Sequence, residues 1–280
     1  MKLCIVGTGR CGTTLLWRML NDHPDLFVFK ETHWLPALHE SFGTLVADTS
    51  EMLGIVNRTH FVTGQPTTDL DVDAYRRSPL YSPTMTVPEF ADSLGRFFAR
   101  AQGKPGWADK TPDYGYFLST IQMYWPGCRI VHVIRDGVRT ATSMSRHPGY
   151  QALAAMGRTH WSPLALDYQP PVRPFAKAPA GAYSKLWYDR LMRIRDEATR
   201  LRPGSYIEVR YEDLQKAPKE ELSRIARFAD LREDKAWLRK AAGQVRTRTA
   251  APRRVDDGMR DFFEASHLRL LEDLGYSIET

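Results

Sequence analysis

A glycine-rich loop near the start of the chain carries the residue types of an anion-binding site, in the segment KLCIVGTGRCGTTLLWRML. A loop that leaves a strand and enters a helix directs backbone N–H groups and the positive end of the helix dipole at one spot. Arg10 adds a planar cation, and Thr13 and Thr14 add hydroxyl donors. A loop of the form G-x-x-x-x-G-K-[ST], which cradles triphosphates, would carry lysine where Thr13 stands. The segment therefore predicts a phosphate or sulfate site without that lysine; the alternative is a glycine-rich turn with no ligand.

Three further charged side chains stand at or just after the ends of apolar runs: Glu31, Lys110 and Arg135. The carboxyl ends of parallel strands meet at one edge of a sheet, where such sheets bind ligands. We therefore expect these side chains to converge with Arg10, although they lie far apart in the sequence. Structural roles are the alternative. Glu31 would then form an ion pair with Arg10 or Lys110, and Arg135 would pair with a nearby carboxylate.

The segments that would position these residues alternate between strand and helix patterns. Short apolar runs typical of buried strands occupy 3–6, 26–29, the start of GWADKTP, 129–134 and 205–210. Helical patterns follow at Thr13, over 86–102 behind a capping box, and over 136–146, 182–201, 211–231 with a break at Pro218, and 256–274. This alternation predicts an α/β fold, with a central parallel sheet flanked by helices and entered through a P-loop-like strand–loop–helix unit.

We expect residues 1–280 to form a single domain. Two stretches do not fit the alternation: 39–87, which indicates loops and short helices, and 147–182, an irregular insertion rich in proline, alanine and glycine. Aromatic side chains in or near these stretches would suit an acceptor surface, although packing is an equally ordinary use for them: Trp34, Phe61, Tyr150 and Trp161.

Composition and charge set the broad class of the protein. The chain carries 39 basic and 33 acidic residues, a net charge of +6 that suits an anionic ligand, although most charges are interspersed. Its cysteines, Cys4, Cys11 and Cys128, lack the spacing of a disulfide framework or a zinc site. No apolar run approaches the roughly 18 residues of a membrane helix, and the start lacks a signal-peptide pattern. We expect a cytoplasmic protein without a metal or a membrane span.

The loop segment TGRCGTTLLWRMLNDHP resembles the 5′-phosphosulfate-binding loop of sulfotransferases that use 3′-phosphoadenosine-5′-phosphosulfate (PAPS). It is most similar to the tyrosylprotein and carbohydrate-type branch, in which R-S-G-T-T-L precedes M-L and H-P, and the chain looks like a soluble bacterial-type member. Cys11 replaces the usual serine, which removes a hydroxyl donor but leaves the backbone donor. The resemblance implies that the phosphosulfate of PAPS, as co-substrate, is held without a metal by Gly9, Arg10, Cys11, Gly12, Thr13 and Thr14.

A second segment supports the same resemblance. VIRDGVRTATS is similar to the family's 3′-phosphate-binding element, an arginine at a strand end and a serine eight residues later, which correspond to Arg135 and Ser143. RYEDL resembles the strand-end segment whose tyrosine, here Tyr211, lies near the adenosine. The basic segment RTRTAAPRR occupies the place of the family's lid over the nucleotide, and its arginines are candidates for phosphate contacts: Arg246, Arg248, Arg253 and Arg254.

The catalytic residues are also implied by the resemblance. FKETHWLP preserves the E-T pair whose glutamate is the general base in the tyrosylprotein-type branch, which implies that Glu31 deprotonates an acceptor hydroxyl. His33 is a rival base, because cytosolic sulfotransferases use a histidine in a K-x-H-L-P context. We favour Glu31 because of its distance from the loop. WADKTPDY resembles the short K-x-P element whose lysine, here Lys110, contacts the bridging oxygen and would stabilise the leaving phosphate.

The sequence therefore predicts a PAPS-dependent sulfotransferase that acts on a small-molecule, glycan or lipid hydroxyl and does not bind nucleic acid. Two other classes remain open. One is a P-loop-type nucleotide kinase or hydrolase, which would need a lysine in the loop and a metal-binding acid. The other is a non-catalytic nucleotide- or nucleic-acid-binding module, which the basic charge allows but no aromatic-basic pattern supports.

Overall fold

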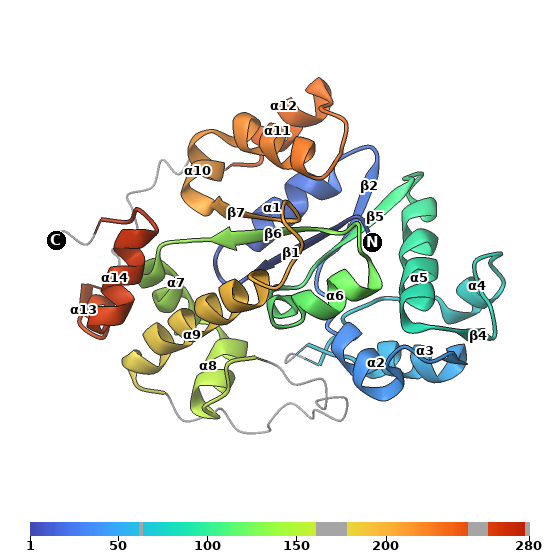
Figure 1. The fold of residues 1–280 in the computed structure, drawn as a ribbon, viewed down its shortest axis with the longest axis horizontal. Coiled ribbons are helices and arrows are strands. Elements are labelled where there is room, and N and C mark those ends of the chain that lie inside the picture. Colours follow the sequence, from blue (N-terminus) through green and yellow to red (C-terminus); the bar gives the residue numbers. More distant parts are fainter. Residues whose placement is uncertain (62–63, 161–177, 246–256, 278–280) are drawn as a thin grey trace.

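A five-stranded sheet forms the centre of the computed structural model, which describes residues 1–61, 64–160, 178–245 and 257–277 (Figure 1). The strands lie in the order β2 (Leu26–Phe29), β5 (Gly106–Lys110), β1 (Leu3–Gly7), β6 (Arg129–Ile134) and β7 (Tyr206–Arg210). Each neighbouring pair is parallel. The chain begins on the central strand, builds one side and then crosses to the other, so the winding reverses at β1. Open α/β sheets bind ligands at the carboxyl ends of their strands beside such a reversal.

Helices cover both faces of the sheet, and the side chains of β1 alternate between the two layers. Leu3 and Ile5 pack in a core cluster with apolar residues of the helices on one face. Cys4 and Val6 pack in a second cluster on the other face. Because β1 is buried on both sides, its sequence reads as a continuous apolar run rather than as an alternating one.

The first face carries α1 (Thr13–Asn21), α10 (Tyr211–Lys216), α11 (Pro218–Phe228) and α12 (Lys235–Ala242) (Figure 1). The opposite face is covered by α5 (Val87–Ala101), the 3₁₀ helix η1 (Pro112–Tyr116), α6 (Leu118–Tyr124) and α9 (Ala180–Ala198). Beside α5 lie α2 (Leu35–Phe42), α3 (Thr49–Arg58), α4 (Val72–Arg76) and a small antiparallel pair, β3 (Ala47–Asp48) and β4 (Thr84–Met85). The other end of α9 contacts α7 (Gly137–Met144), α8 (Pro148–Ala155), α13 (Asp257–Arg260) and α14 (Ala265–Asp273).

The predicted α/β fold and its parallel sheet are confirmed, and the strands lie where the apolar runs indicated. The capping box before α5 is also present, because the backbone N–H of Thr86 donates to a carboxylate oxygen of Glu89 at 2.8 Å. No helix in the ranges that the structure describes has both the length and the apolar character needed to cross a membrane.

Two element predictions were wrong. The last helix, expected over 256–274, is two helices. The Ser184 hydroxyl of α9 donates to the carbonyl oxygen of Phe262 at 2.7 Å, and Glu264 caps a new helix, so Phe262 is 47% exposed instead of lying on the apolar stripe. The stretch 147–182, expected to be irregular, contains α8 and the first turn of α9. His147 caps α8 by accepting from the backbone N–H of Gly149.

Candidate active site at the carboxyl edge of the sheet

The loop between β1 and α1 adopts a backbone that requires glycine at two positions. Gly9 has φ 78° and Gly12 has φ 103°, both in the left-handed region, and Arg10 between them has φ 55°. A Cβ at Gly9 would meet the hydroxyl of Tyr150, and one at Gly12 would meet the ring of Tyr211. The loop therefore packs closely against α8 and against the start of α10, and it leads directly into the N-terminus of α1.

The remaining predicted loop residues differ in what their side chains offer. Cys11 is fully buried in the core cluster beneath the loop, and burial raises the pKa of its thiol. Its backbone N–H is therefore the donor group that the position adds to the loop. Thr13 is buried in the first turn of α1, whereas Thr14 is exposed. Of the two predicted hydroxyl donors, the Thr14 hydroxyl is the accessible one.

A second cluster of donors lies where β6 meets α7. Arg135 donates from Nη1 to the carbonyl oxygen of Arg10 at 3.0 Å, and the Nε of Arg10 donates to the Ser143 hydroxyl at 3.2 Å. The guanidinium of Arg135 also lies over the Tyr211 ring, 4.8 Å from its centre. Its Nε is buried without a partner in the described part of the chain, where it pairs with no carboxylate. Two guanidinium groups and a hydroxyl in one place match the geometry of a phosphate.

The structure thus brings together four residues that the sequence analysis assigned to the nucleotide: Arg10, Arg135, Ser143 and Tyr211. It places the Arg10 guanidinium beside Ser143, on the side assigned to the 3′-phosphate, although the residue belongs to the loop assigned to the 5′-phosphosulfate. The candidate lid arginines at 246–254 lie outside the described residues.

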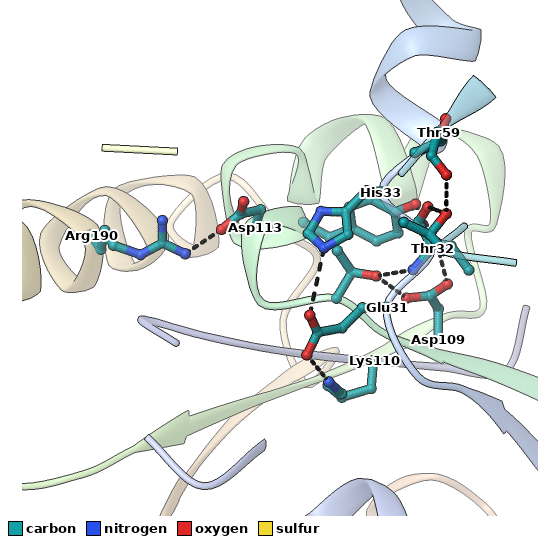
Figure 2. Close-up of polar contacts among 11 residues, drawn as sticks. Glu31, Thr32, His33, Thr59, Asp109, Lys110, Asp113 and Arg190 are labelled. Atoms are coloured by element: carbon teal, nitrogen blue, oxygen red, sulfur yellow. Dashed lines mark hydrogen bonds and ion pairs between the residues drawn. The ribbon is translucent and has the colours of Figure 1, made fainter. Parts of the chain in front are cut away.

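Glu31, Lys110 and His33 form a third cluster at the same edge (Figure 2). The ammonium of Lys110 is fully buried and forms an ion pair with one carboxylate oxygen of Glu31. The Nε2 atom of His33 lies 3.6 Å from the other oxygen, and both Glu31 and His33 remain partly exposed. Strand pairing explains this convergence, because Phe29 at the end of β2 is opposite Asp109 of β5. The residues that follow this last pair on each strand therefore lie side by side.

The charges in this cluster shift one another's pKa values. Burial raises the pKa of Glu31, but the contact with His33 and the charge of Lys110 outweigh it and hold the pKa at about 2. Burial lowers the pKa of His33, but Glu31 and the carboxylate of Asp113 raise it above its ordinary value. Burial also lowers the pKa of Lys110, although Glu31 opposes that effect. Glu31 is therefore a carboxylate held ionised by its contacts with Lys110 and His33.

Sequence reasoning missed a buried ion pair on the far side of His33. Arg190 of α9 is fully buried and pairs with Asp113 of η1, and its guanidinium lies 5.7 Å from the centre of the Tyr116 ring and 5.6 Å from that of Tyr150 (Figure 2). Asp113 belongs to the KTPDY stretch that drew attention to Lys110, so its position was a usable signal. Arg190 lies in an ordinary helical pattern, and nothing in its local sequence indicated a role.

The aromatic residues predicted to form an acceptor surface differ in their exposure and contacts. Trp34 is buried in the core and makes edge contacts with Phe29 and Phe90, so it offers no surface to an acceptor. Phe61 contacts His33 edge to face, with 6.0 Å between ring centres. Tyr150 packs against Gly9 in the loop between β1 and α1. Trp161 lies outside the described residues.

Comparison with known proteins agrees with this architecture. Residues 3–235 match the sequence model of the sulfotransferase family, so the chain belongs to that family. A putative protein-tyrosine sulfotransferase of Caenorhabditis briggsae is 23% identical over 237 residues, which is 83% of this chain and 66% of that protein. The chain therefore spans just under two thirds of this relative's length.

Two solved structures have a similar fold. The sulfotransferase domain from the curacin biosynthetic pathway has a TM-score of 0.57 and 17% identity, with 99% of this chain and 98% of that domain covered. The sulfotransferase domain of the olefin synthase from Synechococcus PCC 7002 has a TM-score of 0.56 and 20% identity, with 99% and 95% covered. At these identities the likeness supports the shared fold.

Proposed function

We propose that the chain transfers the sulfuryl group of PAPS to a hydroxyl acceptor, and that residues 1–280 act as one catalytic domain. The observation that carries this proposal is the convergence of the glycine loop, the Arg10–Arg135–Ser143 cluster and the Glu31–Lys110–His33 cluster at one edge of the sheet. Family membership supports the reaction class.

The residues present fit the two anionic groups of PAPS. The backbone of residues 9–14 and the Thr14 hydroxyl would hold the 5′-phosphosulfate at the N-terminus of α1. Arg135, Ser143 and Arg10 would hold the 3′-phosphate, and the unpartnered Nε of Arg135 is a donor that such an oxygen would satisfy. The Tyr211 ring, packed between Gly12 and Arg135, would lie beside the adenosine. These contacts would require no metal.

PAPS would supply the sulfuryl group and a phosphate leaving group, and two side chains would carry the chemistry. Glu31 would accept the proton of the acceptor hydroxyl as its oxygen attacks sulfur in line, which is worth about 10²–10⁴-fold in general-base catalysis. A sulfur–oxygen bond forms to the acceptor, and the bond from sulfur to the bridging phosphate oxygen breaks. Lys110 would stabilise the charge on that oxygen. The products are a sulfate ester and adenosine 3′,5′-bisphosphate.

The ion pair between Glu31 and Lys110 would then be the arrangement of these two side chains before the donor binds. A carboxylate with a pKa near 2 is a weak base, because a general base works best with a pKa near the working pH. If Lys110 turns to the bridging oxygen, Glu31 loses one of the two contacts that lower its pKa. Donor binding would thus raise the basicity of Glu31, with His33 remaining to orient it or to replace it as base.

The acceptor would enter between the two stretches that interrupt the alternating pattern, 39–87 and 147–182. Phe61, which contacts His33, and Tyr150, which contacts the loop, would face it from the two sides. We propose a small-molecule, glycan or lipid hydroxyl as the acceptor.

Calorimetric titration with adenosine 3′,5′-bisphosphate in EDTA tests donor binding directly. We expect a saturable isotherm that is unchanged by adding Mg²⁺. Absence of binding, together with magnesium-dependent hydrolysis of ATP, would instead support a P-loop nucleotide hydrolase. Salt-sensitive binding to RNA or DNA alone would support a nucleic-acid-binding module. Transfer of labelled sulfate from PAPS across phenols, glycans and lipids would then identify the acceptor class.

A further inference from the structure

Thr32, between the candidate base and its rival, has all of its polar groups engaged. Its backbone N–H donates to the hydroxyl of Thr111 at 2.9 Å, and its own hydroxyl donates to Asp109 Oδ2 at 2.6 Å. Its carbonyl oxygen accepts from the hydroxyl of Thr67 at 2.8 Å. Thr32 is 1% exposed, and its bonds to Thr111 and Asp109 are buried. Figure 2 shows Thr32 beside Asp109.

These bonds begin where the strand ladder ends. The last paired residues of β2 and β5 are Phe29 and Asp109, so no sheet hydrogen bond fixes the backbone of Glu31. His33 has φ 59°, a left-handed conformation that is costly for a residue with a side chain. The side-chain bonds to Thr32 replace the missing ladder and hold the turn in which Glu31 and His33 lie.

Asp109 is the anchor of this network. Its two oxygens accept from the hydroxyls of Thr32 and Thr111, each at 2.6 Å, and the residue is almost fully buried. The Tyr114 hydroxyl lies 2.5 Å from the Thr32 hydroxyl and accepts from the backbone N–H of Leu35 at 3.1 Å, which ties the start of α2 to the same point. A buried carboxylate bound to hydroxyls is costly to retain for packing alone.

Thr67 extends the network to the proposed acceptor side. Its hydroxyl contacts the carbonyl oxygens of both Thr32 and Thr59, at 2.8 and 3.2 Å. Thr59 precedes Phe61, whose ring contacts His33. The backbone that carries Glu31 and the segment that carries Phe61 are therefore joined through one hydroxyl.

We propose that Asp109, Thr111 and Thr32 are positioning residues, which hold Glu31 and His33 against Lys110 for proton transfer and link them through Thr67 to the acceptor side. This inference rests on the proposed function. It assigns the network no contact with the donor or with the acceptor, so its loss would act through Glu31 and His33 and leave nucleotide binding in place.

The test compares Thr32→Val, which removes the hydroxyl at nearly constant shape, with Thr32→Ser, which retains it. Thr68→Val is the matched control, because Thr68 is also a buried threonine and its hydroxyl accepts a bond from Trp34 Nε1 at 3.2 Å, outside the set of bonds that hold Thr32. Asp109→Asn removes the anchoring charge and continues the test if Thr32→Val does not fold. Circular dichroism and thermal unfolding show which variants are folded.

The decisive measurement is the titration of the His33 imidazole by NMR, which needs no acceptor. Burial lowers this pKa and contact with Glu31 raises it, so we expect it to fall in Thr32→Val and to stay unchanged in Thr32→Ser and Thr68→Val. It should also fall in Asp109→Asn, where the lost charge of Asp109 adds to the effect of losing the Glu31 contact. The dissociation constant of adenosine 3′,5′-bisphosphate should stay within about twofold of wild type in all four, less than the tenfold that 1.4 kcal/mol represents.

Turnover of PAPS with 4-nitrophenol as a probe hydroxyl gives the second measurement. We expect kcat to fall about 100-fold in Thr32→Val, the cost of misplacing a catalytic group by about 1 Å, with little change in the KM for PAPS. A folded Thr32→Val protein with a wild-type His33 titration would overturn the positioning role, as would equal His33 shifts in Thr32→Val and Thr32→Ser. Failure of the wild-type protein to bind adenosine 3′,5′-bisphosphate would refute the proposed function, while the His33 titration would still report on the network.

Discussion

The loop between β1 and α1 (the anion loop) and the group of Glu31, Lys110 and His33 (the Glu31 cluster) lie at the same edge of the sheet but are built differently. The loop is one continuous segment of backbone, shaped by two glycines in the left-handed region. The Glu31 cluster is made of side chains from separate strand ends, held by pairing between β2 and β5 and by buried hydroxyls beyond it. We infer that substitutions should separate the two: side-chain changes should disable transfer at the cluster, whereas only changes to backbone or to charged donors should weaken anion binding.

Glu31→Gln should separate transfer from binding most strongly. Removing the base should lower kcat by about 10²–10⁴-fold, because an amide cannot accept the acceptor's proton. The affinity for adenosine 3′,5′-bisphosphate, measured by calorimetry, should stay near that of wild type. Full turnover in this variant would move the base to His33, and His33→Ala would then be the variant that loses activity.

The pH dependence of stability should report the buried carboxylate beneath the cluster. Burial raises the pKa of Asp109 to about 6, from an ordinary value of 3.8. Because the folded pKa is the higher one, the stability linked to this group is fully present below about pH 3.8 and is lost as the pH rises through about 6. The loss relative to Asp109→Asn should be roughly 3 kcal/mol at 1.36 kcal/mol per pKa unit.

Thermal or urea unfolding of wild type and Asp109→Asn between pH 4 and pH 7 measures this difference. The slope of the difference against pH is the informative quantity, because the substitution also changes the hydrogen bonds of Thr32 and Thr111. Parallel stability profiles for the two proteins would show that Asp109 does not titrate in this range.

Arg135→Ala should produce the opposite pattern to Glu31→Gln. Loss of charge-assisted hydrogen bonds worth about 1.5–3 kcal/mol should weaken binding of adenosine 3′,5′-bisphosphate by about 10–100-fold. Adenosine 5′-phosphate, which lacks the 3′-phosphate, should lose much less affinity. Equal losses for the two nucleotides would refute the assignment of Arg135 to the 3′-phosphate.

The smallest effect is expected for Cys11→Ser. The Cys11 thiol is buried in the core beneath the loop. A serine hydroxyl at the same place, although common in the family, should therefore not reach the donor. The dissociation constant for adenosine 3′,5′-bisphosphate should change by less than about threefold, below the 1.4 kcal/mol that a tenfold change represents. A tenfold gain in affinity would show that this side chain faces the donor after all.

The sequence predicted what depends on local pattern. The loop, the strand ends and the residues carried over by resemblance were legible because each lies in one short segment with its own spacing. The turn at His33, the bonds that fix Thr32 and the Arg190–Asp113 pair were not legible, since the bonds involved join residues 35 or more positions apart. The break between α13 and α14 was missed for the same reason. The Ser184 hydroxyl of α9 donates to the carbonyl oxygen of Phe262, and the spacing of apolar residues does not indicate such a bond.

The pairing of β2 with β5 also sets how the chain can vary in length. Successive side chains of a strand point to opposite faces, so inserting one residue within β5, ahead of Asp109, would bring the carboxylate of Asp109 to the place of the Lys110 ammonium. Two like charges would then oppose each other across the reaction centre. Insertions in the surface stretches can be accommodated by rearrangement of a loop, whereas one added residue in β5 would exchange the ammonium at its end for a carboxylate, so the length of this strand matters to the proposed chemistry as much as the lysine does.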